Sequence, residues 1–227
     1  MLSVATATDM LSELQKHLSD IYQVEPGYDV SDFLVTDRTL AKTLGGESVI
    51  ENTDESVLLT EDEEGMALSV YLDSQMLGRL DRDKPLQALK ASSLNDLWTV
   101  LEGISHFNYL VWSAGRDRSV TLLELEMQAE VDKFISTWLM ARDQEECEFA
   151  NRLHGWLFDS IHFKPELSED EHRRYRTAND YAARFCHGLM RRLRDNCNRT
   201  MRELRRFYRL KQTEKISHIH SQAYARN

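Results

Sequence analysis

Residues 94–112, LNDLWTVLEGISHFNYLVW, contain more information about the fold than any other part of this chain. Their apolar side chains recur at helical spacing and cover nearly the whole circumference of the predicted helix. A helix that is apolar on most sides is stable in water only where other elements cover it. We therefore predict a helix over this stretch with a central position in the fold.

Helical periodicity continues on the C-terminal side. Thr121 and Glu124 form a capping box that opens a helix to about residue 140, and a further helix covers about residues 144–161. A second capping box, Ser168 to Glu171, opens a long helix. This helix can break at 195–198, a run of poor helix formers. We predict a bundle of four or five helices over residues 86–213 and a flexible tail over 214–227.

The N-terminal part combines a helix with β structure. Leucines at helical spacing predict a first helix over about residues 7–23, and a short strand is expected over 30–35. Residues 57–60 and the alternating run 66–72 are joined by an acidic, Gly-containing link, which predicts a β-hairpin, and 77–80 are expected to add a short edge. The fold class is thus α+β, mainly α. A small α+β part over residues 1–85 precedes the bundle, or shares one core with it.

Composition limits the class of protein. Apolar residues make up 41% of the 227 residues and charged residues 29%, as in globular domains. Apolar runs stay below the roughly 18 residues that a membrane span needs, and the start has no basic region typical of a secretory signal. Three cysteines without C-x-x-C spacing favour a reducing compartment. We therefore predict a cytoplasmic protein.

Charge is divided unevenly along the chain. Residues 172–227 hold thirteen Arg, two Lys and four acidic residues, a net charge of +11, whereas residues 1–171 carry −21. The overall charge of −10 conceals this difference. Such asymmetry indicates a charged partner or a docking role for the C-terminal part.

The basic residues of this part gather on one side of the predicted helix, opposite an apolar stripe. Guanidinium groups bind carboxylates and phosphates in pairs of hydrogen bonds, so the stripe suits an acidic protein surface, a second copy of this chain, or a nucleic-acid backbone. A membrane surface would require a free apolar face, and a merely solvated face would contain more acids. We predict partner binding by eight side chains: Arg173, Arg176, Arg184, Arg191, Arg194, Arg202, Arg205 and Arg209.

Polar residues on the apolar helices are candidates for a divalent metal site. Glu102 and His106 lie four residues apart on the predicted central helix, and Glu126 and Glu130 lie four apart on the next. Carboxylate and imidazole groups on facing helices bind divalent metals in helical bundles. The usual Glu-x-x-His spacing is missing here, and the first pair has a simpler interpretation as a buried structural ion pair.

Signatures of nucleophilic catalysis or of nucleotide phosphate binding are missing from the sequence, so we predict no catalytic residue. The best prediction is a non-enzymatic interaction or regulatory protein that docks through its Arg-rich C-terminal helix, with a homodimer as one form of this. The alternatives are a nucleic-acid-binding protein that uses the same face, and a metal-dependent helical-bundle enzyme.

Overall fold

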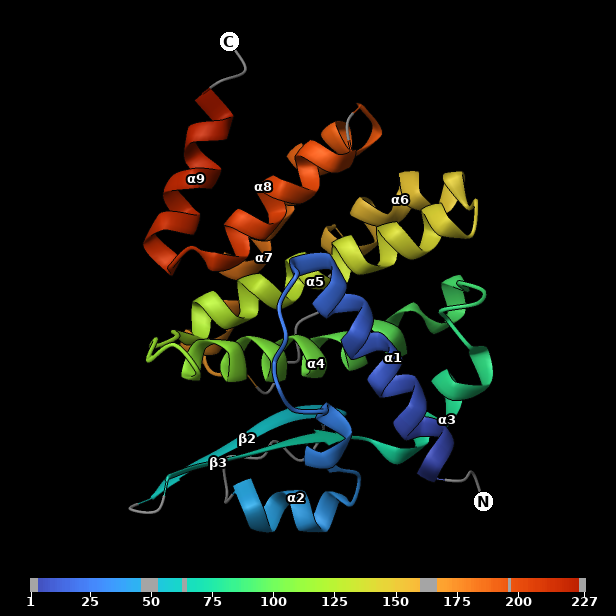
Figure 1. The fold of residues 1–227 in the computed structure, drawn as a ribbon, viewed down its shortest axis with the longest axis vertical. Coiled ribbons are helices and arrows are strands. Elements are labelled where there is room, and N and C mark those ends of the chain that lie inside the picture. The colour runs from blue at the N-terminus through green and yellow to red at the C-terminus, as the bar shows by residue number, and fades with distance from the viewer. Residues whose placement is uncertain (1–3, 46–52, 63–64, 160–166, 196, 225–227) are drawn as a thin grey trace. The chain divides into compact units, whose positions relative to one another are not determined.

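The structure is a computed structural model that describes residues 4–45, 53–62, 65–159, 167–195 and 197–224 (Figure 1). It is α+β and mainly α, as predicted, because helices make up 75% of it and its strands form one small sheet. Contacts divide the chain into two compact units, residues 1–19 with 25–112 and residues 20–24 with 113–227. The Arg-rich helix therefore belongs entirely to the second unit.

The described elements follow each other in a simple order. Those of residues 4–114 are α1 (Val4–Tyr22), the 3-10 turn η1 (Val30–Phe33), β1 (Leu34–Val35), α2 (Arg38–Gly45), β2 (Glu55–Asp62), β3 (Gly65–Leu72), α3 (Ser74–Asp83), the 3-10 turn η3 (Ala91–Ser93) and α4 (Leu94–Ala114). Those that follow are α5 (Leu122–Asp143), α6 (Cys147–Phe158), α7 (Glu169–Asp195), α8 (Cys197–Arg209) and α9 (Gln212–Tyr224).

The sheet of the first unit has the strand order β1-β3-β2. β2 and β3 pair antiparallel, with Val57 opposite Val70, which confirms the predicted hairpin. β1 pairs parallel with the other edge of β3, and its two residues follow η1, so only the end of the strand predicted over 30–35 is extended. Figure 1 shows α2 beside the hairpin, where Ala41 of α2 packs with Leu58 and Tyr71.

The apolar helix that the sequence places at the centre is α4. Every residue from Val100 to Tyr109 is buried except Glu102, which is half-buried. A Cβ atom added at Gly103 would lie 3.2 Å from side-chain atoms of Val70 and Leu72, so glycine is what allows α4 to lie this close to β3. The alternation of β3 and the periodicity of α4 thus meet in one apolar core.

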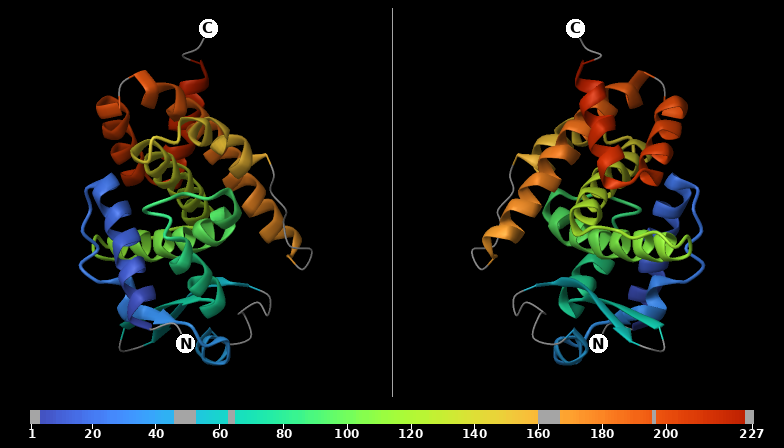
Figure 2. Two further views of the ribbon diagram at one scale, coloured as in Figure 1. Left: turned by 90° about the vertical axis from the view of Figure 1, so that its right-hand side faces the viewer. Right: turned by 90° about the vertical axis from the view of Figure 1, so that its left-hand side faces the viewer.

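The second unit is built around α5. Its residues from Glu124 to Ala141 are all buried except Glu130, because α6 and α7 both pack on it. α7, the long orange helix in Figure 2, ends at Asp195, and α8 begins at Cys197, which confirms the predicted break. The two helices are held together by Phe185 and Phe207, whose rings stack with centroids 3.8 Å apart.

Both predicted capping boxes open helices. The Thr121 hydroxyl accepts a hydrogen bond from the Glu124 amide at 3.1 Å, at the start of α5. At α7 the Ser168 hydroxyl accepts from the Glu171 amide at 3.3 Å, and the Glu171 carboxylate accepts from the Ser168 amide at 2.9 Å. These bonds satisfy amide groups that a helix start would otherwise leave without partners.

The edge strand expected over residues 77–80 is wrong, because this segment lies in α3. Asp73 caps this helix by accepting from the amides of Gln75 and Met76. Met76, Leu77 and Leu80 are buried, which is the spacing of a helix rather than of a strand.

The C-terminal segment also differs from expectation. In place of a flexible tail over residues 214–227, the chain forms α9 as far as Tyr224, and this helix buries Lys215 and Ile219. A domain boundary at residue 85 stays a prediction. The compact units divide after residue 112, because α4 packs on the sheet.

Candidate functional site

The basic face of α7 and α8 points partly outward. Arg176, Arg184 and Arg191 of α7 and Arg202 of α8 are exposed. In the part of the chain that the structure describes, none of these four makes an ion pair or a hydrogen bond. The opposite side of α7 is buried, as predicted, through Ala178, Ala182, Phe185, Leu189 and Leu193. The amphipathic pattern therefore separates a core face from an arginine face, here defined as Arg176, Arg184, Arg191 and Arg202.

Other arginines of the predicted set have partners within the chain. Arg173 pairs with Asp170 one turn earlier in α7. Arg205 donates to the carbonyl of Ile21 at 2.9 Å, and Arg209 donates to the carbonyls of Tyr22 and Gln23, both at 3.3 Å. These carbonyls lie at the C-terminal end of α1, where the helix dipole favours a cation. The side chain of Arg194 lies outside the described residues.

A basic pocket of about 320 Å³ lies beside Arg184. Helices α6, α7 and α9 contribute its lining, which consists of His154, Ala183, Arg184, His187, Ile219, His220 and Gln222. The imidazoles of His154 and His187 are 5.5 Å apart between centroids, and His154 Nε2 is 2.9 Å from the carbonyl oxygen of Ala183. Since the described residues of this lining include one Arg and three His but no Asp or Glu, the pocket suits an anionic group.

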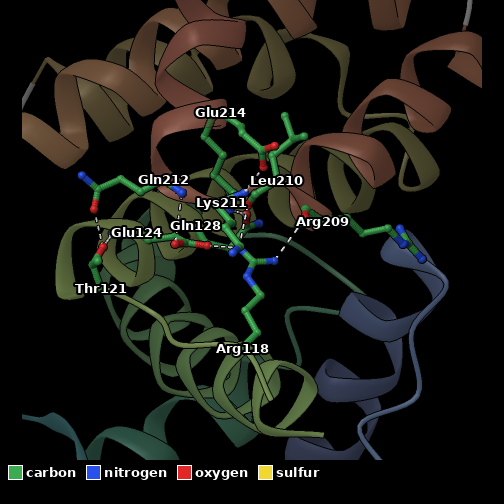
Figure 3. Close-up of polar contacts among 10 residues, drawn as sticks. Arg118, Thr121, Glu124, Gln128, Arg209, Leu210, Lys211, Gln212 and Glu214 are labelled. Atoms are coloured by element: carbon green, nitrogen blue, oxygen red, sulfur yellow. Dashed lines mark hydrogen bonds and ion pairs between the residues drawn. The ribbon is translucent and has the colours of Figure 1, made fainter. Parts of the chain in front are cut away.

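A buried polar network joins the start of α5 to the turn before α9 (Figure 3). Arg118 forms an ion pair with Glu124, and the exposed fractions of the two side chains are 9% and 2%. The same guanidinium donates to the carbonyls of Arg209 and Leu210, at 3.1 and 2.7 Å. Glu124 also accepts from the Gln212 amide at 3.1 Å. The network therefore fixes the α8–α9 turn on α5.

Lys215 extends this network into the core. It is fully buried, donates to the side-chain oxygen of Gln128, and lies 5.1 Å from the centroid of the Phe207 ring. Burial lowers the pKa of this amine from 10.5 to about 7, although the carboxylates of Glu124 and Asp132 act in the opposite direction. Desolvation prevails because burial disfavours the charged form of a lysine.

Two hydroxyl groups complete the polar core of this unit. Gln128 donates to Asp132 at 2.7 Å, and Tyr22 donates its hydroxyl proton to the same carboxylate. The rings of Tyr22 and Tyr208 stack with centroids 4.2 Å apart. Burial is the main cause that raises the pKa of both phenols well above the usual value, followed by the charge of Asp132. Tyr22 is thus a neutral donor that holds the end of α1 in this unit, and Tyr208 packs against its ring.

The four predicted metal-ligating residues belong to two different units. Glu102 and His106 lie in the first unit, where Glu55 of β2 joins them. Glu126 and Glu130 lie in the second unit and face basic side chains there. Glu126 is 3.9 Å from Arg174, and Glu130 accepts from Lys133 at 2.7 Å.

Glu55, Glu102 and His106 form the one group of three potential metal ligands among the described residues. Each offers a ligand atom, and these atoms lie within 4.8 Å of one another. His106 Nδ1 is 3.4 Å from a carboxylate oxygen of Glu55, and both side chains are largely buried. The sequence singled out two of the three residues. It missed Glu55, because a strand residue 47 positions before Glu102 has no local signal that connects it to α4.

Comparison with known proteins adds no information on function. No protein-family model, curated protein or solved structure matches this chain. None of the helices in the described ranges combines the length and the apolar character that crossing a bilayer requires.

Proposed function

We propose that this chain is an interaction protein that binds an acidic protein surface through the arginine face. The observation that carries the proposal is the exposure of Arg176, Arg184 and Arg191 on one side of α7. At 100° per residue these three fall within about 80° of each other, over about 22 Å of the helix axis. Cations so placed repel one another in the free protein, and an acidic partner relieves that repulsion.

The type of residue supports a protein partner with carboxylates. Guanidinium groups form two parallel hydrogen bonds with one carboxylate and lose less hydration than ammonium groups. The rest of the chain carries a strong negative charge, −21 over residues 1–171, which disfavours a long phosphate polymer. A second copy of the chain supplies such an acidic surface, so self-association is one form of the proposal.

The basic pocket beside Arg184 adds a place for a specific contact. A cavity of about 320 Å³ holds one side chain, and a carboxylate inside it would meet Arg184, His187 and His220. Charges of an exposed face alone give little affinity, whereas a partly enclosed ion pair gives more. We therefore assign the pocket as the anchor for one acidic side chain of the partner, and the remaining arginines as the surrounding contacts.

The proposal is tested with a fluorescent poly-Glu peptide, a poly-Gln peptide and a single-stranded oligonucleotide of matched charge. We expect the peptide with carboxylates to bind most tightly, and Arg184→Glu combined with Arg191→Glu to weaken it at least about tenfold, or 1.4 kcal/mol. The matched control is Arg82→Glu combined with Lys211→Glu, which removes the same charge from exposed positions elsewhere. Sedimentation velocity of the same variants measures self-association.

Three outcomes contradict the proposal. If the control weakens binding as much as the α7 variant does, net charge alone governs the interaction. If the oligonucleotide binds more tightly than the peptide, the face is a nucleic-acid surface. If neither the peptide nor a second copy binds, the arginine face has no docking role for an acidic protein.

A further inference from the structure

We propose that Glu55, Glu102 and His106 bind one divalent transition-metal ion in the first unit. The proposal is independent of the docking function, since none of these residues belongs to the arginine face. It rests on the convergence of three ligand atoms from two elements, which lie within 4.8 Å of one another.

The fold builds this convergence from a helix and a strand. Glu102 and His106 are four residues apart, so they occupy the same side of α4, one turn from each other. Glu55 is the first residue of β2, opposite Leu72 of β3. A site whose ligands come from two packed elements is held in place by the core rather than by a loop.

Gly103 lies next to Glu102 and brings the strand within reach. A Cβ at this position would be 3.2 Å from Cγ of Glu55, closer than ordinary van der Waals contact. A larger residue at position 103 would therefore have to push the side chain of Glu55 away from α4 by a few tenths of an ångström. The tight packing also limits how far the three side chains can move apart.

The chemistry of the ligands selects the ion. Two carboxylates and one imidazole carry a charge of −1 or −2, depending on the proton of the imidazole, which a divalent cation balances. Imidazole favours Zn²⁺ and Co²⁺ over Mg²⁺ and Ca²⁺, which prefer oxygen ligands alone, and the two carboxylates also suit Mn²⁺. Three protein ligands leave one or more positions for water, as in open zinc sites.

Burial adds a second argument. His106 is 6% exposed, and the side chain of Glu55 is 12% exposed, so both titratable groups are held away from bulk water. Removing carboxylates from water costs free energy, and a bound cation recovers it. The ion pair between His106 and Glu55, at 3.4 Å, is the competing explanation.

The experiment uses the full chain without a histidine tag, stripped with chelator and then titrated with Zn²⁺ and Mn²⁺ by calorimetry. We expect one site per chain that Glu102→Gln, Glu55→Gln and His106→Gln each weaken by more than the roughly 10–100-fold that loss of an outer-shell partner causes. Glu25→Gln, at an exposed position of the same unit, is the matched control and keeps the site. Co²⁺ absorption bands that vanish in His106→Gln identify imidazole as a ligand.

The variants also separate the site from a structural ion pair. Metal raises the midpoint of thermal unfolding of the parent chain, and in Glu102→Gln this rise disappears. Far-UV circular dichroism checks that each variant is folded. His218→Gln with His220→Gln, in α9 of the second unit, removes a histidine pair as an adventitious ligand of the added metal. No binding of either metal, or equal binding by the parent and Glu102→Gln, overturns the proposal.

Discussion

The arginine face and the arginines of the same unit that bind backbone carbonyls differ in the groups that surround them. Arg176, Arg184 and Arg191 point to solvent, whereas Arg118 and Arg209 reach backbone carbonyls at the ends of helices. Every one of these side chains is a guanidinium group with several hydrogen-bond donors, and the sequence pattern alone does not distinguish the two sets. The difference indicates that an arginine near a chain turn or a helix end stabilises the fold, whereas the members of the arginine face on α7 and α8 remain available for a partner.

Loss of Arg118 is expected to give the largest effect on stability. Arg118→Met leaves Glu124 buried without its cation, which costs about 3–5 kcal/mol of unfolding free energy. Urea denaturation followed by circular dichroism measures it. Arg184→Met is the control and should stay within about 0.5 kcal/mol of the parent. Equal effects of the two substitutions would mean that the buried ion pair contributes nothing.

Lys215 makes stability depend on pH in a known direction. Its pKa is 10.5 when unfolded and about 7 when folded, so the unfolded chain binds more protons between these values. Stability therefore rises with pH across this window, by up to about 5 kcal/mol, and the gain is lost progressively as pH falls from 10.5 to about 7. Lys215→Met lacks this dependence, and its stability relative to the parent should be highest near pH 6 and should fall toward pH 10. Parallel pH profiles in thermal unfolding would contradict this.

The arginines that bind the end of α1 should have an intermediate effect. Arg205→Gln and Arg209→Gln each remove charge-assisted hydrogen bonds to carbonyls, which is worth about 1–2 kcal/mol. Amide exchange measured by mass spectrometry should speed up in residues 20–24 in both variants. If exchange increases only elsewhere, these contacts do not hold the helix end.

The smallest effect is expected on the arginine face itself. Arg184→Ala and Arg191→Ala should change the unfolding free energy by less than about 0.5 kcal/mol, because no described neighbour depends on them. Guanidinium chloride denaturation measures this. If either variant loses more than about 1 kcal/mol of unfolding free energy, these side chains stabilise the fold, and they no longer differ from Arg118 and Arg209.

Elements with a local signal were predictable from the sequence. The capping boxes at Thr121 and Ser168 and the break near Asn196 depend on residues within one turn, and the structure confirms all three. The hairpin follows from the alternating run together with the Gly-containing link that precedes it, and the pairing of β2 with β3 confirms it. The sequence did not predict α9, because the segment after residue 214 is mostly polar and is typical of a solvated tail. In the structure, Lys215 and Ile219, four residues apart, lie on its buried side.

The candidate sites were less predictable, since they depend on long-range packing. Helical periodicity places Glu102 beside His106, but only the close approach at Gly103 adds Glu55. The basic pocket combines residues of α6, α7 and α9, whose histidines are too far apart in sequence to suggest a group. Helical periodicity placed the exposed arginines opposite the buried stripe of α7, but it did not show that Arg205 and Arg209 bind backbone carbonyls.

Because Lys215 is buried, the rate at which its amine is chemically labelled measures how often α9 detaches from the core. An acylating reagent reaches it only when the helix leaves the aromatic surface of Phe207, whereas the exposed Lys84 and Lys90 react at once. The ratio of the two labelling rates, read by mass spectrometry, gives how often the last helix opens. In this way, a side chain that is inaccessible in the folded chain measures the local opening of its own helix.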